Sequence, residues 1–226
     1  MQRVIRLCLR SCVRPSVSHC AALLVLTLAS CHRGGKPDAS APVDQRPFAA
    51  FATQRIIVTP TAHVRAGDSL GWVQGMGGPR SVARMLDSSI VVSLDGRGLA
   101  ARWVLPAALV RSFERNRGYA TDPYLLGIEP LRLASFGFAS RYGEPLSSQL
   151  RTMIALEADA RFVLLPVDLR FEKDGARMRG VLRLAFVDPR SAEAKWVGEV
   201  KGELAADPAR ALASVADRIA DLFAAP

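Results

Sequence analysis

The sequence predicts an α/β (α+β) domain with a single mixed β-sheet that ends in an antiparallel meander and is packed by amphipathic helices. Three runs of apolar or alternating residues follow one another at 161–171, 178–188 and 194–202, with turn residues between them. The first run starts apolar on both faces, which indicates burial on two sides. A last run, 207–223, has its apolar residues on one helical face and is expected to cover one face of the sheet.

A basic and then apolar leader opens the chain. Its first twenty residues hold four arginines and no acidic residue, and an apolar run follows at 21–28. This order is typical of a secretory signal peptide, and the run is shorter than the ~20 residues that a membrane-spanning helix needs. We therefore expect export of the chain, with residues 1–30 as the signal peptide.

The leader ends in Leu28-Ala29-Ser30-Cys31, which resembles a bacterial lipobox at every position. The resemblance implies that the Cys31 thiol receives a diacylglycerol and that the chain is cut before it. Acyl chains contribute ~0.8 kcal/mol per buried CH₂, so release from a membrane would be negligible. An ordinary signal peptide cut near a cysteine is the alternative. We expect a lipid anchor at Cys31 on the periplasmic side, and His32 after it favours the outer membrane over the inner.

Cysteine use narrows the possible chemistry. The four cysteines stand at 8, 12, 20 and 31, so the mature chain would keep only the lipidated one. A disulfide within a monomer, a thiolate metal site and a cysteine nucleophile are then excluded. We expect a domain stabilised by core packing alone, and we assign no metal ligand and no cofactor.

The charge balance argues against nucleic acid as a partner. The whole chain carries +9; removing the four leader arginines leaves 26 Lys and Arg against 21 Asp and Glu, an excess of +5. Only four of those basic residues are lysines, and the arginines are dispersed rather than gathered in a stripe with stacking aromatics. An anionic lipid headgroup, an acidic partner or a simply solvated surface fits this composition better.

The remaining chain divides into a linker and one domain. Residues 31–47, from the lipidated cysteine onward, are rich in Gly, Pro, Ser and Asp without apolar periodicity, which predicts a flexible linker. Residues 48–226 have the length of a single α/β domain. Its first element is a strand at 55–64, broken or at a sheet edge at Pro60.

Gly71–Arg80 is rich in glycine but lacks the order of a phosphate-binding motif, so we interpret it as a loop with Trp72 exposed or at a rim. Such a loop could dock a partner. Apolar periodicity then predicts helices at 81–94, from Pro106 to about Gly118, and at 146–158, although Ile90-Val91-Val92 would also suit a strand. Asp122-Pro123 predicts a short helix to about Leu126. The roles of Gly71–Gly78 and Trp103–Tyr142 stay open.

The C-terminal half resembles a domain that recurs in envelope lipoproteins. A strand at Val181–Asp188, a turn at Pro189–Glu193 and Trp196 on the returning strand are similar to the corresponding parts of the curli-secretion lipoprotein, the amino-terminal domain of TolB and the lipoprotein activator of penicillin-binding proteins. The resemblance covers mainly Glu144–Pro226. It implies a non-enzymatic adaptor built on a mixed sheet, and its motif carries no catalytic residue to transfer.

Candidate chemical groups have simpler structural explanations. His32 lies in the linker, and His63 has no neighbour at metal-ligand or triad spacing, so we expect a structural or surface role. Polar residues of two neighbouring strands predict cross-strand ion pairs on a solvated face, with a polar binding site as the alternative: Asp168, Arg170, Arg179 and Arg183. A denser polar group around two helix ends is explained by pairing on helix surfaces: Asp95, Arg97, Glu114, Arg115 and Asn116. We assign no catalytic residue.

These observations predict a membrane-anchored periplasmic lipoprotein that acts as a non-enzymatic adaptor or accessory subunit in envelope assembly or transport. It would bind an envelope protein through loops and helix faces. A lipid- or glycan-binding module that uses the arginine excess is the first alternative. A hydrolase with an unrecognised site is the second.

Overall fold

The computed structural model describes residues 47–157 and 160–224. Residues 1–46, which contain the expected signal peptide, the Cys31 anchor and nearly all of the expected linker, lie outside the described residues. The helices and strands of the described part follow one another in this order: η1 Ala49–Phe51, β1 Ile56–Val58, β2 His63–Val64, α1 Trp72–Gly75, α2 Pro79–Asp95, α3 Pro106–Arg115, α4 Glu129–Arg132, α5 Leu146–Leu156, β3 Phe162–Asp174, β4 Arg177–Asp188, β5 Glu193–Lys201 and α6 Pro208–Asp221.

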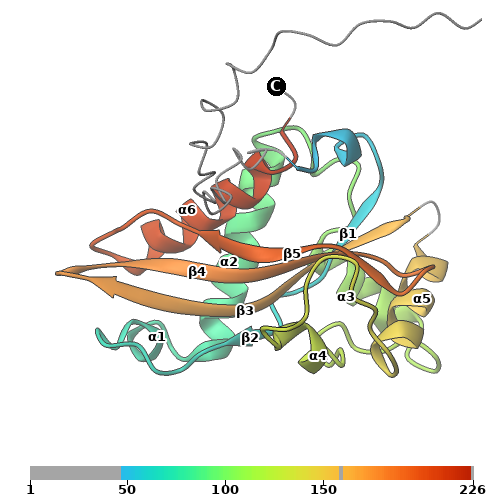
Figure 1. Cartoon of the computed structure of the whole chain (residues 1–226), viewed down its shortest axis with the longest axis horizontal. Helices are drawn as coiled ribbons and strands as arrows, with labels where there is room; N and C mark the ends of the chain where they lie inside the picture. The colour runs from blue at the N-terminus through green and yellow to red at the C-terminus, as the bar shows by residue number, and fades with distance from the viewer. Residues whose placement is uncertain (1–46, 158–159, 225–226) are drawn as a thin grey trace, which may run out of the picture. The chain divides into compact units, whose positions relative to one another are not determined.

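One mixed sheet organises the domain (Figure 1), as the sequence predicted. Its strand order is β1-β3-β4-β5, with β2 also pairing with β3. Both short strands run parallel to β3, with Ile56 opposite Phe162 and His63 opposite Asp168. The pairs β3–β4 and β4–β5 are antiparallel, which confirms the predicted meander.

The predicted first strand is interrupted where Pro60 occurs. β1 ends at Val58 and β2 begins at His63, and the connection stays close to β3 because the N–H groups of Thr59 and Ala62 donate to carbonyls of that strand, at 3.1 and 3.0 Å. Proline has no N–H to donate to a sheet ladder, so it separates two short pairing segments. The second segment places His63 beside the centre of β3.

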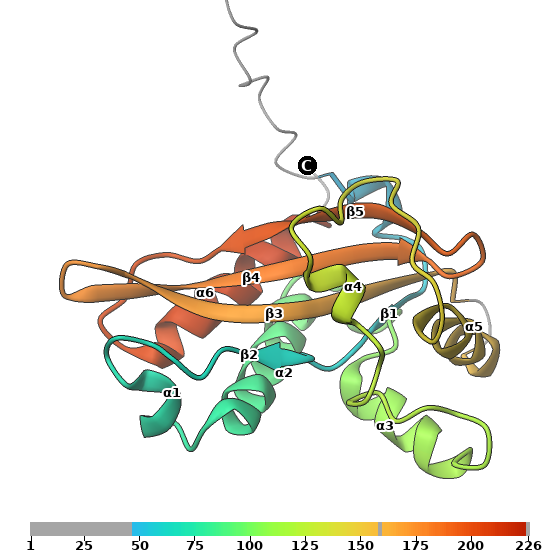
Figure 2. The same ribbon diagram turned by 60° about the horizontal axis from the view of Figure 1, so that its bottom comes forward.

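Helices cover both faces of the sheet, so the core has two parts (Figures 1 and 2). Phe162 and Leu164 of β3 pack in one hydrophobic cluster with α2 and α6. Val163 and Leu165 point to the other face and pack in a second cluster with α3, α4 and α5. Successive side chains of β3 point to opposite faces of the sheet, so the strand contributes to both clusters. This is why it begins as a continuous apolar run.

The C-terminal helix α6 covers the sheet face that carries α2, as expected from its one-sided apolar pattern. The Asp207 side chain accepts the N–H of Arg210 at 2.9 Å and caps the helix, and Pro208 occupies the first turn, where its missing N–H costs little. Arg97, just past the end of α2, donates to Asp221 of α6 at 2.7 and 2.9 Å. This pairing fixes one helix to the other.

The 71–80 segment contains an unpredicted helical turn. The carboxylate of Asp68 accepts the N–H groups of Trp72 and Val73 at 2.8 and 2.9 Å, which stabilises the start of α1. Trp72 is half-buried, in edge-on contact with Phe171 of β3, with ring centroids 5.5 Å apart. The rim position expected for this tryptophan is confirmed.

The helix expected at Asp122–Leu126 is wrong. The Asp122 side chain accepts the N–H of Tyr124 at 3.0 Å and its carbonyl accepts that of Leu125 at 2.8 Å, so these residues form a turn. Asp-Pro is common both at helix starts and in turns, because the same short side chain caps either. The helix of this region is α4, which begins five residues later than Tyr124. The strand alternative for Ile90-Val91-Val92 is also wrong, since α2 continues through it.

Candidate functional site

A cleft of about 680 Å³ lies between β2, the first half of α2 and the turn at 122–125. We call it the β2–α2 cleft. Its volume is in the range of small-molecule sites. The residues that line it are Thr61, Ala62, His63, Val64, Ala66, Pro79, Arg80, Ala83, Arg84, Asp122, Tyr124 and Leu125.

Two arginines give this cleft a positive wall. Arg80 and Arg84 are one helical turn apart on α2, and both are exposed and line the cleft. Among the described residues neither has a carboxylate within 4 Å. Like charges at this spacing repel each other by a few tenths of a kcal/mol. No carboxylate of the described residues therefore neutralises either guanidinium group.

A buried carboxylate lies beneath the same wall. Asp87 of α2 is buried, and its Oδ1 accepts both the N–H of Thr61 at 2.8 Å and the Thr61 hydroxyl at 2.6 Å. Burial raises the pKa of Asp87 from 3.8 to about 6, although the two Thr61 hydrogen bonds lower it. The bonds fix the wall formed by residues 59–62 against α2.

Tyr124 forms the outer side of the cleft with a half-exposed ring. Partial burial raises the pKa of its hydroxyl, and the negative charges of Asp87 and Asp122 raise it further, while Arg84 lowers it. The hydroxyl thus stays protonated at physiological pH and can donate a hydrogen bond. The ring offers a flat apolar surface beside the two arginines.

His63 connects the cleft to a buried acid in the sheet. Asp168 of β3 is almost completely buried, and its Oδ2 accepts two hydrogen bonds from Arg65, at 2.9 and 2.6 Å. Its Oδ1 has no hydrogen-bond partner and lies 3.9 Å from Nε2 of His63. The imidazole is partly exposed and lines the cleft, as a surface role for His63 predicted.

The structure corrects the cross-strand ion pairs expected around Asp168. Arg183 is the register partner of Asp168, yet it donates to the carbonyls of Leu131, Leu133 and Phe136 at 2.6–2.7 Å. Asp168 pairs with Arg65 instead, because the parallel pairing of β2 with β3 continues to Arg65, the exposed residue after β2, whose N–H donates to the carbonyl of Leu169 at 2.9 Å. Arg183 therefore fixes the 131–136 segment over the sheet.

Arg170 and Arg179 do form ion pairs on the sheet, as predicted, but their partners are Glu172 and Glu199, and only Arg179–Glu172 joins two neighbouring strands. Arg170 donates to Glu199 at 2.7 Å and to Glu172 at 2.8 Å, and Arg179 approaches Glu172 at 3.4 Å. The hydrogen bond between Arg170 and Glu199 is the main reason why the pKa of Arg170 is raised and the pKa of Glu199 is lowered. These pairs use the charges structurally, on the partly solvated end of the sheet.

The polar group predicted around two helix ends does not form one cluster. Arg97 pairs with Asp217 and Asp221 on α6, whereas Glu114 pairs with Arg117 within the turn after α3. Asn116 donates to the Ser112 carbonyl at 2.8 Å and caps the end of α3. Pairing on helix surfaces thus holds for Glu114 and Asn116, and Arg97 bridges two helices, whereas Asp95 and Arg115 make no side-chain ion pair with the described residues.

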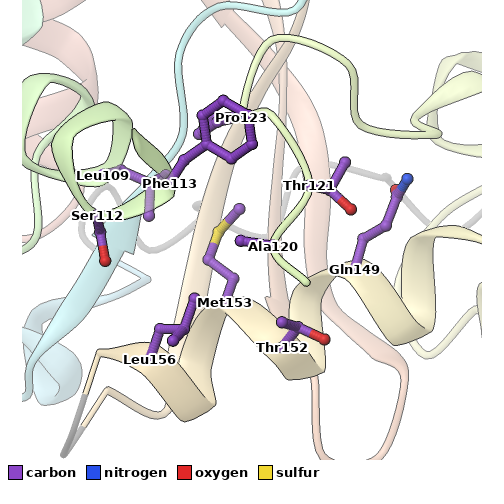
Figure 3. A pocket seen from close by; sticks show the side chains of 10 residues that line it. All are labelled: Leu109, Ser112, Phe113, Ala120, Thr121, Pro123, Gln149, Thr152, Met153 and Leu156. Carbon is purple, nitrogen blue, oxygen red and sulfur yellow. The ribbon is translucent and has the colours of Figure 1, made fainter. Parts of the chain in front are cut away.

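A second depression, between α3 and α5, is too small to be a site. Figure 3 shows its mostly apolar lining, in which Met153 of α5 and Phe113 of α3 participate. Its volume is about 10 Å³, roughly the space of one water molecule. It is a packing defect between helices rather than a binding site.

Within 47–157 and 160–224 no group of three or more His, Cys, Asp and Glu side chains could hold a metal ion. In the same ranges no helix has the length and apolar character needed to cross a membrane.

Comparison with known proteins leaves the family open. No family model matches the chain, and no curated protein matches it. Among solved structures, the chain is similar to a subunit of the PelC dodecamer from Paraburkholderia phytofirmans, with a TM-score of 0.34 and 11% sequence identity over 76% of this chain and 89% of that one. A TM-score this low carries no argument about fold or function, so the resemblance seen in the C-terminal half stays a prediction.

Proposed function

We propose that this protein is a non-enzymatic adaptor of the bacterial envelope, anchored by lipid at Cys31 and binding a protein partner in envelope assembly or transport through residues 119–138. The observation that carries the proposal is that most exposed large apolar side chains lie in one segment of the chain. Of the seven large apolar side chains exposed among the described residues, five lie in this segment: Tyr119, Tyr124, Leu125, Leu133 and Phe138. Large exposed apolar groups that gather in this way are typical of interaction surfaces.

The segment presents these side chains from a fixed backbone. Leu131 and Phe136 are buried against the sheet, and Arg183 binds three carbonyls of the same stretch. Leu133 and Phe138, between and beside them, are 59% and 76% exposed. A backbone held in place loses little freedom on binding, which favours affinity. The exposure is therefore part of a folded surface.

The leader supports the cellular setting. A signal peptide that ends in a lipobox would hold the domain near a membrane, with the outer membrane favoured by His32. The partner would then be an envelope protein. Since the anchor limits diffusion, a modest affinity suffices for partners in the same membrane.

The test combines crosslinking with a matched control. A photoreactive amino acid at position 133 of the full chain, in cells, should give a defined adduct whose partner is identified and purified. Phe138→Ser should then weaken binding of that partner to the full chain by about tenfold or more, as expected for an aromatic anchor. Val92→Ser removes an equally exposed side chain, 71% against 76%, on α2 outside the segment.

The proposal fails if the two serine variants bind the purified partner equally well, or if position 133 gives no defined adduct. Thermal unfolding of both variants should match the unaltered chain, since neither side chain is buried. A lost fold would thereby be separated from a lost contact.

A further inference from the structure

The β2–α2 cleft has features that the adaptor role does not use. Its two arginines are exposed and lie one helical turn apart on α2, and the buried Thr61, which is hydrogen-bonded to Asp87, also lines it. Only Tyr124 and Leu125 belong both to the cleft and to the adaptor segment. These features lie on three separate segments of the chain, at 61–66, 79–84 and 122–125. Only the fold brings them together.

The charges of the lining residues indicate the sign of the ligand's charge. Arg80 and Arg84 are the cations, His63 can add a further one when protonated, and Asp122 is the only carboxylate among the described residues that line the cleft. Oδ1 of Asp122 already accepts a backbone N–H. Guanidinium groups bind carboxylates and phosphates through paired, charge-assisted hydrogen bonds. An anionic group placed between the two arginines also removes their mutual repulsion.

The rest of the lining indicates an organic body attached to that group. Tyr124 and Leu125 provide an apolar side, while the hydroxyl of Tyr124 is a donor at the rim. A volume of about 680 Å³ exceeds what a bare phosphate fills. A ring with hydroxyl groups, or a glycerol unit, would contact both the aromatic face and the polar rim.

We infer that the β2–α2 cleft binds a small organic anion, with its carboxylate or phosphate on Arg80 and Arg84 and its body against Tyr124. Two sources share this chemistry: an acidic sugar and the headgroup of an anionic phospholipid. The cleft shares Tyr124 and Leu125 with the proposed adaptor segment 119–138, but Leu133 and Phe138 do not line it, so the two proposals can be tested separately.

The test uses the full chain in detergent micelles and four probes in calorimetric titrations: glucuronate, sn-glycerol 3-phosphate, inorganic phosphate and neutral glucose. We expect saturable binding of glucuronate or glycerol phosphate, at least tenfold tighter than that of glucose and weakened by salt. Preference for the first assigns an acidic sugar as the source, and preference for the second a lipid headgroup.

Variants locate the binding. Arg80→Gln with Arg84→Gln should weaken binding at least tenfold, and Tyr124→Leu by a few-fold. The control is Arg111→Gln with Arg115→Gln, two exposed arginines of α3 with the same spacing and no carboxylate within 4 Å among the described residues. This control and Phe138→Ser should leave the affinity unchanged.

The inference is overturned by any of three results. Neither organic anion binds saturably; the Arg80 and Arg84 double variant binds like the control; or inorganic phosphate binds as tightly as both organic anions. Because Phe138→Ser tests the adaptor surface alone, failure of one proposal leaves the other intact.

Discussion

At the residue scale, single polar contacts decide what surrounds the β2–α2 cleft. The bonds from Thr61 to Asp87 join residues 26 positions apart, and those from Arg65 to Asp168 join residues 103 apart. Both carboxylates are buried, so each needs donors that remain close to it. These contacts fix β2 and its flanks between α2 and β3.

The buried acid Asp87 predicts a pH-dependent stability. Its pKa is about 6 in the folded state against 3.8 ordinarily, so between these values the native state keeps a proton that the unfolded state has released. The free energy of unfolding should therefore fall as pH rises from about 4 to about 6, by up to about 3 kcal/mol. Below pH 4 and well above pH 6 this contribution no longer changes.

Asp87→Asn keeps an oxygen for Thr61 but cannot ionise, so it should flatten that slope. Urea unfolding of both proteins at pH 4, 5, 6 and 7 measures the difference. Equal slopes in the two proteins would mean that Asp87 titrates as an exposed acid does.

At the element scale, the close approach of α6 to the sheet depends on glycines that the strands place under it. A Cβ added to Gly202, at the end of β5, would clash with Ser214 Oγ and lie 2.9 Å from Cγ2 of Val215 and 3.1 Å from the carbonyl of Ala211. A Cβ added to Gly180 on β4 would lie 2.8 Å from Cγ2 of the same valine. The amphipathic pattern of the helix thus explains which face it buries, and the glycines explain how near it packs.

Gly202→Ala should lower the free energy of unfolding by about 1–3 kcal/mol, because α6 must shift to accommodate the methyl group. Gly67→Ala is the matched control: an added Cβ there meets nothing within 4 Å and its backbone is not left-handed. We expect the control to stay within about 0.5 kcal/mol of the unaltered chain in urea unfolding. A similar loss in both variants would contradict the packing argument.

At the scale of the whole molecule, the domain has a core on both faces of its sheet and follows a predicted lipid anchor in the sequence. Phe48 packs against Phe186, Trp196 and Phe223, with ring centroids about 5 Å apart, and its N–H donates to the carbonyl of Leu222 at 3.0 Å. The first described residues are therefore tied to the last helix. Phe48 stands 17 positions after Cys31 in the sequence.

The anchor itself is tested on the full chain in cells. Labelling with radioactive palmitate should mark the protein, and Cys31→Ser should abolish the label, because the diacylglycerol that carries the labelled chains is attached through the Cys31 thiol. Cys20→Ser is the control and should keep the label. Label retained by Cys31→Ser would disprove lipidation at this residue.

The sequence by itself determined the elements whose signal is local. The meander, the C-terminal helix, the break at Pro60 and the helix at 81–94 follow from periodicity and from the missing N–H of proline, and the structure confirms them. The segment 119–142 resisted prediction because it has little regular structure and is held by a distant side chain, Arg183. The turn at Asp122 is a case in which one local signal suits two conformations.

Only the tertiary structure decided the site. In the sequence, Arg80 ends the Gly-rich segment predicted as a loop, Arg84 lies in the helix predicted at 81–94, and Asp168 is expected to pair with the strand next to it. The parallel pairing of β2 with β3 instead brings Arg65 and His63 to that acid, and places the cleft between segments up to 64 residues apart. Local periodicity fixes which face of an element is buried, but which charges meet depends on pairing across the fold, and that has no local signal.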